Sequence, residues 1–196
     1  QPVDWSSGWP VMGNAGEPYW KFRKPKSDSK TIVNPVETDE FDSSKLGMQW
    51  QWQNDYKESY GQATSMGFFR LFTYALPELG DVSNLWYVPN MLLQKIPADE
   101  FTATTKLSFC SRNSDQYVGL VCMSAEYSSV GLQRTEDGYE LQIRHNPNAM
   151  RTHLTDEVLT VDTLKPTQKG TPRKGRPAEM HIKDVYLRMS IKDSQV

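Results

Sequence analysis

The sequence predicts an all-β protein, folded as an antiparallel β-sandwich or barrel. Short runs with apolar residues at alternate positions recur at intervals of about 8 to 12 residues. Gly, Pro, Asn, Asp and Ser separate these runs, as expected for turns between strands. No segment carries the apolar stripe with a period of 3.6 residues that an amphipathic helix requires. Together, these observations favour stacked or closed sheets over helical layers.

The 196-residue chain is long enough for one domain with a short appendage. Residues 1–36 are predicted to be irregular, and residues 21–30 form a charged, serine-containing link. Prolines interrupt this first part repeatedly, at Pro2, Pro10, Pro18, Pro25 and Pro35. The alternating runs begin after it. We therefore expect the β-domain to comprise residues 37–196.

The predicted strands follow the alternating runs, in the order 46–52, 67–74, 101–109, 117–123, 129–134, 139–144 and 184–191. Thr135-Glu136-Asp137-Gly138 contains the Asp-Gly pair of a tight hairpin. Residues 145–183 interrupt the rhythm and are expected to form a long irregular basic loop. Within it, residues 165–177 carry no aromatic residue among their basic ones, so a solvated loop is favoured over a nucleic-acid patch.

The first run contains two tryptophans separated by one glutamine. In a strand, Leu46, Met48, Trp50 and Trp52 share one face, while Gln49, Gln51 and Gln53 share the other. The first face is predicted to pack in the core and the second to be presented to a ligand. For Trp52, near the end of the run, both core packing and ligand contact stay open.

Composition and motifs argue against several functional classes. The formal net charge of -2 gives no electrostatic reason to expect binding to nucleic acid or to an anionic membrane. No apolar run is long enough for a membrane helix, and the N-terminus does not resemble a signal peptide. No phosphate-binding loop, nucleophile elbow, CxxC motif or zinc-type Cys/His spacing is present. His145, His153 and His181 are each expected to be surface residues.

The two cysteines are predicted to remain unpaired. If the loop at residues 111–116 closes a hairpin, Cys110 faces Tyr117 and Cys122 faces Thr105. The two sulfur atoms would then lie on opposite faces of one sheet, which prevents a disulfide.

The positive functional signal consists of flat rings together with amides and a guanidinium group. Neutral glycans offer no charge, so proteins bind them by stacking rings on sugar faces and by hydrogen-bonding the hydroxyl groups. The candidate carbohydrate-binding residues are Gln49, Gln51, Trp52, Arg70, Trp86 and Gln94. Aromatic residues also fill β-sheet cores, so composition alone leaves the two interpretations even.

Several stretches resemble, in order, the β-sandwich that follows the catalytic propeller in β-xylosidases of glycoside hydrolase family 43. The resemblance covers residues 37–144 and 184–191, with motifs at 41–52, 67–71, 90–95, 101–107, 119–121, 132–138 and 185–188. Residues 1–5 and 8–13 resemble the end of the propeller, so residues 1–36 are interpreted as the end of that domain and a linker. The family continues with further strands after residues 185–188. Either those strands are dispensable, or this sequence is part of a larger folded unit truncated at its C-terminal side.

The resemblance implies a concanavalin A-like sandwich of the jelly-roll type, grouped as carbohydrate-binding module family 91, with xylan or xylo-oligosaccharides as ligand. It implies a non-catalytic module of a larger hydrolase, located outside the cytoplasm with its polymeric substrate, although related enzymes can be intracellular. The alternative is a structural domain that stabilises the propeller and shapes its active-site pocket. No cofactor is required, but many sandwiches of this fold hold structural calcium, for which Asp39 and Asp42 offer oxygen ligands.

Overall fold

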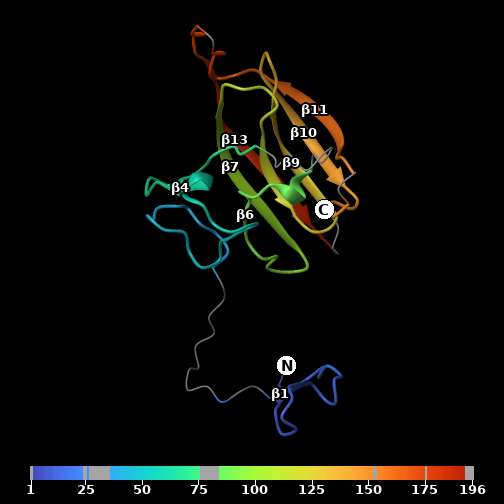
Figure 1. Ribbon diagram of the computed structural model, residues 1–196. Helices are drawn as coiled ribbons and strands as arrows, with labels where there is room; N and C mark the ends of the chain where they lie inside the picture. The colour runs from blue at the N-terminus through green and yellow to red at the C-terminus, as the bar shows by residue number, and fades with distance from the viewer. Residues whose placement is uncertain are drawn as a thin grey trace. The chain divides into compact units, whose positions relative to one another are not determined.

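The computed structural model describes residues 2–23, 26, 36–75, 84–151, 154–174 and 176–192 (Figure 1). Most of the expected linker, together with His153, lies outside these ranges. The chain divides into two compact units, residues 1–35 and 36–196. In the first unit, β1 (Val3–Asp4) and β2 (Val11–Met12) pair as a short antiparallel hairpin. No helix among the described residues is long and apolar enough to cross a membrane.

The second unit is an antiparallel β-sandwich made of two main sheets (Figure 1). The four-stranded sheet has the order β11-β10-β9-β8, and the three-stranded sheet has the order β12-β13-β7. The first sheet contains β8 (Tyr117–Cys122), β9 (Tyr127–Arg134), β10 (Tyr139–Asn146) and β11 (Glu157–Leu164). The second contains β7 (Phe101–Ser111), β12 (Gln168–Lys169) and β13 (Met180–Ile191). This architecture confirms the predicted concanavalin A-like, all-β class.

Shorter elements precede the main sheets in the chain. β3 (Gln51–Trp52) pairs with β6 (Leu92–Leu93), and β4 (Gly61–Ala63) pairs with β5 (Phe69–Leu71). Among the described residues, the helical turns are two short 3-10 segments, η1 (Glu58–Tyr60) and η2 (Leu85–Tyr87). These segments are linked to the sandwich by hydrogen bonds, including one of 2.8 Å from Gln116 Nε2 to Thr73 Oγ1.

The core lies between the two sheets, where buried side chains from both sheets meet. Along β7, odd-numbered residues are more buried than their even-numbered neighbours, which is the period of two expected of a strand with one face covered. The buried cluster is Phe109, Leu132, Tyr139, Met180 and Ile182. Both sheets contribute to it, so burying these side chains holds the sheets face to face.

Tyr139 connects the two sheets by a side-chain hydrogen bond. It begins β10 in the four-stranded sheet and is 1% exposed. Its hydroxyl donates to the Met180 carbonyl oxygen at 2.8 Å and lies 3.4 Å from the Phe109 carbonyl oxygen, both in the three-stranded sheet. Its ring packs against the Phe109 ring, with centroids 5.6 Å apart. The apolar ring thus fills the core while the hydroxyl fixes how the sheets are aligned.

The prediction that the two cysteine-containing strands form a hairpin was wrong. β7 pairs with β13 rather than with β8, and β8 pairs with β9. Cys110 therefore faces His181, and Cys122 faces Ser128. Both cysteines are free, as predicted, but the reason is that they belong to different sheets. Alternation within a strand does not reveal which strand becomes its partner.

The prediction of an irregular loop at residues 145–183 was also wrong for the middle of that segment. It contains β11, which forms an edge of the four-stranded sheet, and the short β12. Every residue of β11 before Leu164 is exposed. Because neither face of this edge strand is buried, its sequence lacks the alternation of apolar and polar residues that identifies a half-buried strand. By contrast, the predicted turn at residues 135–138 was correct: it joins β9 to β10, and Thr135 N donates to Gly138 O at 3.0 Å.

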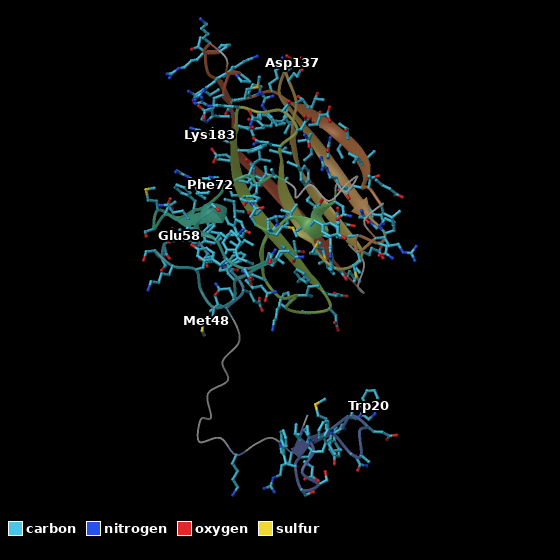
Figure 2. All side chains as sticks on the ribbon, viewed as in Figure 1. Trp20, Met48, Glu58, Phe72, Asp137 and Lys183 are labelled. Atoms are coloured by element: carbon cyan, nitrogen blue, oxygen red, sulfur yellow. The ribbon has the colours of Figure 1, made fainter. Side chains whose placement is uncertain are left out.

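The predicted strand at residues 46–52 is reduced to Gln51 and Trp52. A turn precedes it, in which Trp50 N donates to Gly47 O at 3.2 Å. Gln49 and Trp50 do not alternate, because both side chains donate to Asp39 Oδ2, at 3.2 and 2.7 Å. Met48, predicted to be in the core, points into solvent (Figure 2). Trp50 and Trp52 are half-buried, within a cluster of aromatic rings.

Replacing Tyr139 with phenylalanine should lower the free energy of unfolding by about 1–3 kcal/mol, because the buried carbonyl of Met180 loses its side-chain donor. Urea denaturation of the whole chain measures this change. Tyr186→Phe is the matched control, since Tyr186 is 66% exposed on β13 and its loss should cost far less. Equal stability of the two variants would contradict the structural role of Tyr139.

Stability should also fall at alkaline pH. Burial raises the pKa of Tyr139 from 10.0 to about 12. Above pH 10 the unfolded chain therefore loses this proton before the folded chain does, so the stabilisation that is complete below pH 10 declines up to about pH 12. Denaturation measured across this range should show a steeper loss for the wild type than for Tyr139→Phe. Identical pH dependence in the two proteins would contradict the burial of this hydroxyl.

Candidate functional site

The outer face of the four-stranded sheet carries a row of polar side chains. On β10, Tyr139 and Leu141 pack toward the core, so Glu140, Gln142 and Arg144 lie on the opposite face of the sheet, where Gln142 is buried and the other two are half-buried. On β9, Gln133 lies directly across from Glu140 and faces the same way. Alternation on two neighbouring strands thus brings four long polar side chains together on one surface.

These side chains form a continuous hydrogen-bonded chain. Arg144 Nη2 donates to Gln133 Oε1 at 2.6 Å and to Gln142 Oε1 at 2.8 Å. Arg144 Nε also donates to Gln142 Oε1, at 3.1 Å. Gln142 Nε2 in turn donates to Glu140 Oε2 at 2.7 Å, which also accepts from Thr160 Oγ1 at 3.3 Å. The network contains one cation, Arg144, and one carboxylate, Glu140, so it carries no net charge.

The ring of Tyr117 in β8 packs against the guanidinium of Arg144. The Arg144 Cζ lies 3.8 Å from the centre of the Tyr117 ring, within the range of a strong cation–π contact. The Tyr117 hydroxyl is 3.0 Å from Ser129 Oγ. Burial raises the pKa of Tyr117, so this ring stays neutral at ordinary pH. The charged end of Arg144 is therefore fixed by two glutamines and one ring.

A hollow of about 450 Å³ opens over this network. Its lining includes Gln133, Glu140, Gln142 and Arg144, together with Val158 of β11 and residues 114–115 and 134–136. Asp137, labelled in Figure 2, marks the tip of the hairpin that joins β9 to β10, at the same end of the sheet as this hollow. We call this surface the polar hollow. Its fixed donors and acceptors suit a neutral ligand rich in hydroxyl groups.

The other end of the same face is covered. Tyr127 and Asn146 face each other across β9 and β10, and both are almost completely buried. The Tyr127 hydroxyl accepts from Leu85 N at 2.9 Å and contacts Asp156. Asn84 Nδ2, just before η2, donates to the carbonyls of Ala149 and Leu154 at 3.1 and 3.2 Å. The polar hollow is thus the uncovered part of this sheet face.

A second hollow, of about 650 Å³, lies beside β3 and β4. Its lining includes Trp52, Tyr56, Glu58, Gln62 and Phe69. The Trp52 ring is the centre of an aromatic cluster, with its centroid 5.7 to 6.0 Å from those of Tyr60, Tyr56 and Phe69. Tyr56 is 58% exposed and so offers part of a ring to solvent. We call this surface the aromatic hollow.

The six carbohydrate-binding residues predicted from sequence are spread over several elements. Trp52 lines the aromatic hollow, whereas Gln49 is bonded to Asp39. Gln51 is exposed on β3, and Gln94 is half-buried just after β6. These four belong to neighbouring segments, but they are not gathered around one hollow.

The remaining two predicted residues lie elsewhere. Arg70 is exposed on β5, with its guanidinium 5.8 Å from the centre of the Phe68 ring. Trp86 is half-buried in η2, and its carbonyl oxygen accepts from Gln53 Nε2 at 3.4 Å. A glycan contact for any of the six stays a prediction.

The calcium site expected at Asp39 and Asp42 also stays a prediction. The two carboxylate oxygens of Asp39 already accept hydrogen bonds, from Phe41 N at 2.8 Å and from the Gln49 and Trp50 side chains. Asp42 is exposed. Within the described ranges, the one group of three metal-ligating side chains is elsewhere, at Cys110, Glu179 and His181.

Sequence reasoning missed the residues of the polar hollow. The signal was available, because residues 139–144 alternate apolar and polar, and their polar positions are Glu140, Gln142 and Arg144. That pattern predicted the strand but was not extended to its outer face. The contribution of Gln133 also depends on the register between β9 and β10, which the turn at residues 135–138 fixes.

The comparisons with known proteins agree on one family. The model of the β-xylosidase C-terminal concanavalin A-like domain matches residues 38–195. The chain is 28% identical over 161 residues to a β-xylosidase from Formosa agariphila, covering 70% of this chain and 27% of that protein. It is 24% identical over 176 residues to a non-reducing end α-L-arabinofuranosidase from Bacteroides ovatus, covering 89% of this chain and 30% of that protein.

The chain thus matches less than a third of the length of either relative. No solved structure gives a significant match. The family match extends over most of the chain and coincides with the β-sandwich unit of residues 36–196. This chain belongs to the family of C-terminal concanavalin A-like domains of glycoside hydrolase family 43 β-xylosidases.

Proposed function

We propose that this domain is a non-catalytic module that binds xylan or xylo-oligosaccharides as part of a larger family 43 glycoside hydrolase. The observation that carries the proposal is the polar hollow, where Gln133, Gln142 and Arg144 are held in one hydrogen-bonded network. Xylan is uncharged in its backbone and rich in hydroxyl groups. Binding it requires paired donors and acceptors rather than a strong local charge.

The network would lower the cost of binding because its side chains are already ordered. Immobilising a flexible side chain on binding costs about 0.5–1.5 kcal/mol, and the contacts of Arg144 with Tyr117 and the two glutamines have already restricted it. Arg144 donates to its protein partners through Nε and Nη2. We assign the Nη1 N–H groups to sugar hydroxyls, which are neutral acceptors.

The aromatic hollow would supply a second kind of contact. Tyr56 presents a partly exposed ring beside Trp52, and Glu58 and Gln62 lie at the same hollow. Ring stacking with flanking polar groups is a common way to hold a sugar. This hollow keeps Trp52, one of the candidate residues from the sequence, in the proposal.

The names of the two relatives support xylan-related glycans as ligands, because one is a β-xylosidase and the other an α-L-arabinofuranosidase. Both are more than three times longer than their matched parts. We therefore infer a catalytic domain as the covalent partner of this module, and a location outside the cytoplasm, where the polymer is found.

A second candidate function is structural, as an accessory domain that packs against the catalytic propeller. The observation that favours it is a group of exposed apolar side chains in and around β5, where Phe68, Leu71, Phe72 and Tyr74 are 39 to 45% exposed. Figure 2 shows Phe72 on the same side of the sandwich as Glu58. In this role, the domain would stabilise the hydrolase without binding a glycan.

Replacing Arg144 with glutamine should weaken binding to soluble xylan by about tenfold or more, because a hydrogen bond from a charged donor contributes about 1.5–3 kcal/mol. Affinity electrophoresis in gels containing xylan, supported by calorimetry with xylohexaose, measures this change. Arg188→Gln is the matched control: Arg188 is an exposed arginine on β13, in the other sheet. Circular dichroism establishes that both variants are folded.

Two outcomes would overturn the glycan proposal or its placement. Wild-type protein that is not retarded by xylan, in gels where a known xylan-binding module is retarded, would contradict glycan binding and leave the structural role. Equal weakening by Arg144→Gln and Arg188→Gln would contradict the polar hollow as the site.

A further inference from the structure

A cysteine, a glutamate and a histidine meet on the outer face of the three-stranded sheet, away from both hollows. Cys110 of β7 lies directly across from His181 of β13. Glu179 is two residues before His181, and the intervening Met180 is buried in the core. Because neighbouring residues point to opposite faces, Glu179 and His181 both point outward, beside Cys110.

The geometry points to a site for a divalent metal ion, and we propose that Cys110, Glu179 and His181 bind zinc. The sulfur of Cys110 lies 3.0 Å from Glu179 Oε1 and 3.5 Å from His181 Nε2. All three ligand atoms lie within 4.8 Å of one another. Zinc bonds of about 2.3 Å to sulfur and about 2.0–2.2 Å to nitrogen or oxygen place tetrahedral ligand atoms about 3.5 Å apart. The two separations from sulfur, 3.0 and 3.5 Å, lie at or slightly below that value.

Surrounding groups hold the ligands in this arrangement. Arg112 Nη2 donates to Glu179 Oε2 at 3.1 Å, which turns the other carboxylate oxygen toward Cys110. The Glu179 carbonyl oxygen accepts from Gly170 N at 2.7 Å. The His181 carbonyl oxygen accepts from Thr167 N at 2.8 Å and from Thr167 Oγ1 at 3.1 Å. Such supporting contacts orient ligands and strengthen metal sites.

The ligand chemistry favours zinc over calcium. A thiolate and an imidazole are ligands for borderline or soft ions, whereas calcium prefers several oxygen atoms. Three protein ligands leave a fourth tetrahedral position for water, on a cluster whose members are half-buried or exposed. On binding, the thiol of Cys110 releases its proton to solvent. Zinc then accepts one electron pair from each of the three ligand atoms, and its oxidation state does not change.

Two other roles for Cys110 fit the structure less well. A disulfide within the chain would need Cys122, which lies in the other sheet. A reactive nucleophile needs a lowered thiol pKa, whereas burial and the neighbouring Glu179 raise the pKa of Cys110 to about 11 in the absence of metal. A bound zinc ion would connect β7 to the first residues of β13 and so stabilise the folded chain.

Titrating the whole reduced chain with Co²⁺ tests the site, because cobalt occupies zinc sites and reports its ligands by absorbance. We expect a thiolate-to-cobalt charge-transfer band, the intense visible bands of tetrahedral cobalt, and loss of both on adding Zn²⁺. Cys110→Ser should abolish the charge-transfer band, and His181→Gln should weaken binding by about tenfold or more. Cys122→Ser is the matched cysteine control and should bind as the wild type does.

Zinc should also raise the melting temperature of the wild type and of Cys122→Ser, but not that of Cys110→Ser. Circular dichroism without metal shows whether each variant is folded. His181→Gln provides an independent test if Cys110→Ser does not fold. A wild type without the charge-transfer band, a band that persists in Cys110→Ser, or a band lost in Cys122→Ser would each overturn the proposal.

Discussion

The two sheets of this domain are held in alignment by one buried tyrosine. The Tyr139 ring packs in the core, and its hydroxyl donates to the Met180 carbonyl oxygen in the opposite sheet. Burial of apolar side chains stabilises the stacking of the two sheets. It does not fix their relative position, because the hydrophobic effect is not directional. A hydrogen bond between the sheets does have direction. The start of β10 is therefore tied to the start of β13.

Both outer surfaces of the sandwich depend on this alignment. Immediately after Tyr139, Glu140 and Gln142 face outward and enter the polar hollow. On either side of Met180, Glu179 and His181 face outward toward Cys110. One core contact thus fixes the strands that carry two chemically different surfaces, one made of amides and a guanidinium, the other of metal-ligating groups.

The fold class and many strands were predictable because β7, β9, β10 and β13 carry clear alternation or turn signals. Strand partners were not, since Cys110 and His181 meet through a pairing of strands about 70 residues apart. The exposed edge strand β11 lacked apolar alternation and was mistaken for a loop. The strand predicted at residues 46–52 was mostly wrong because the side chains of Gln49 and Trp50 both donate to Asp39. The periodicity of the sequence does not predict this contact.

The central functional claim is that the uncovered part of the four-stranded sheet is where a glycan binds. A crystal structure of this chain with xylohexaose would test it most directly. We expect density for xylose rings in the polar hollow, with sugar hydroxyls within hydrogen-bond distance of Arg144 and Gln133, which are both partly exposed. Density for the sugar on another surface, or none in crystals soaked at saturating xylohexaose with the hollow open to solvent, would contradict the account.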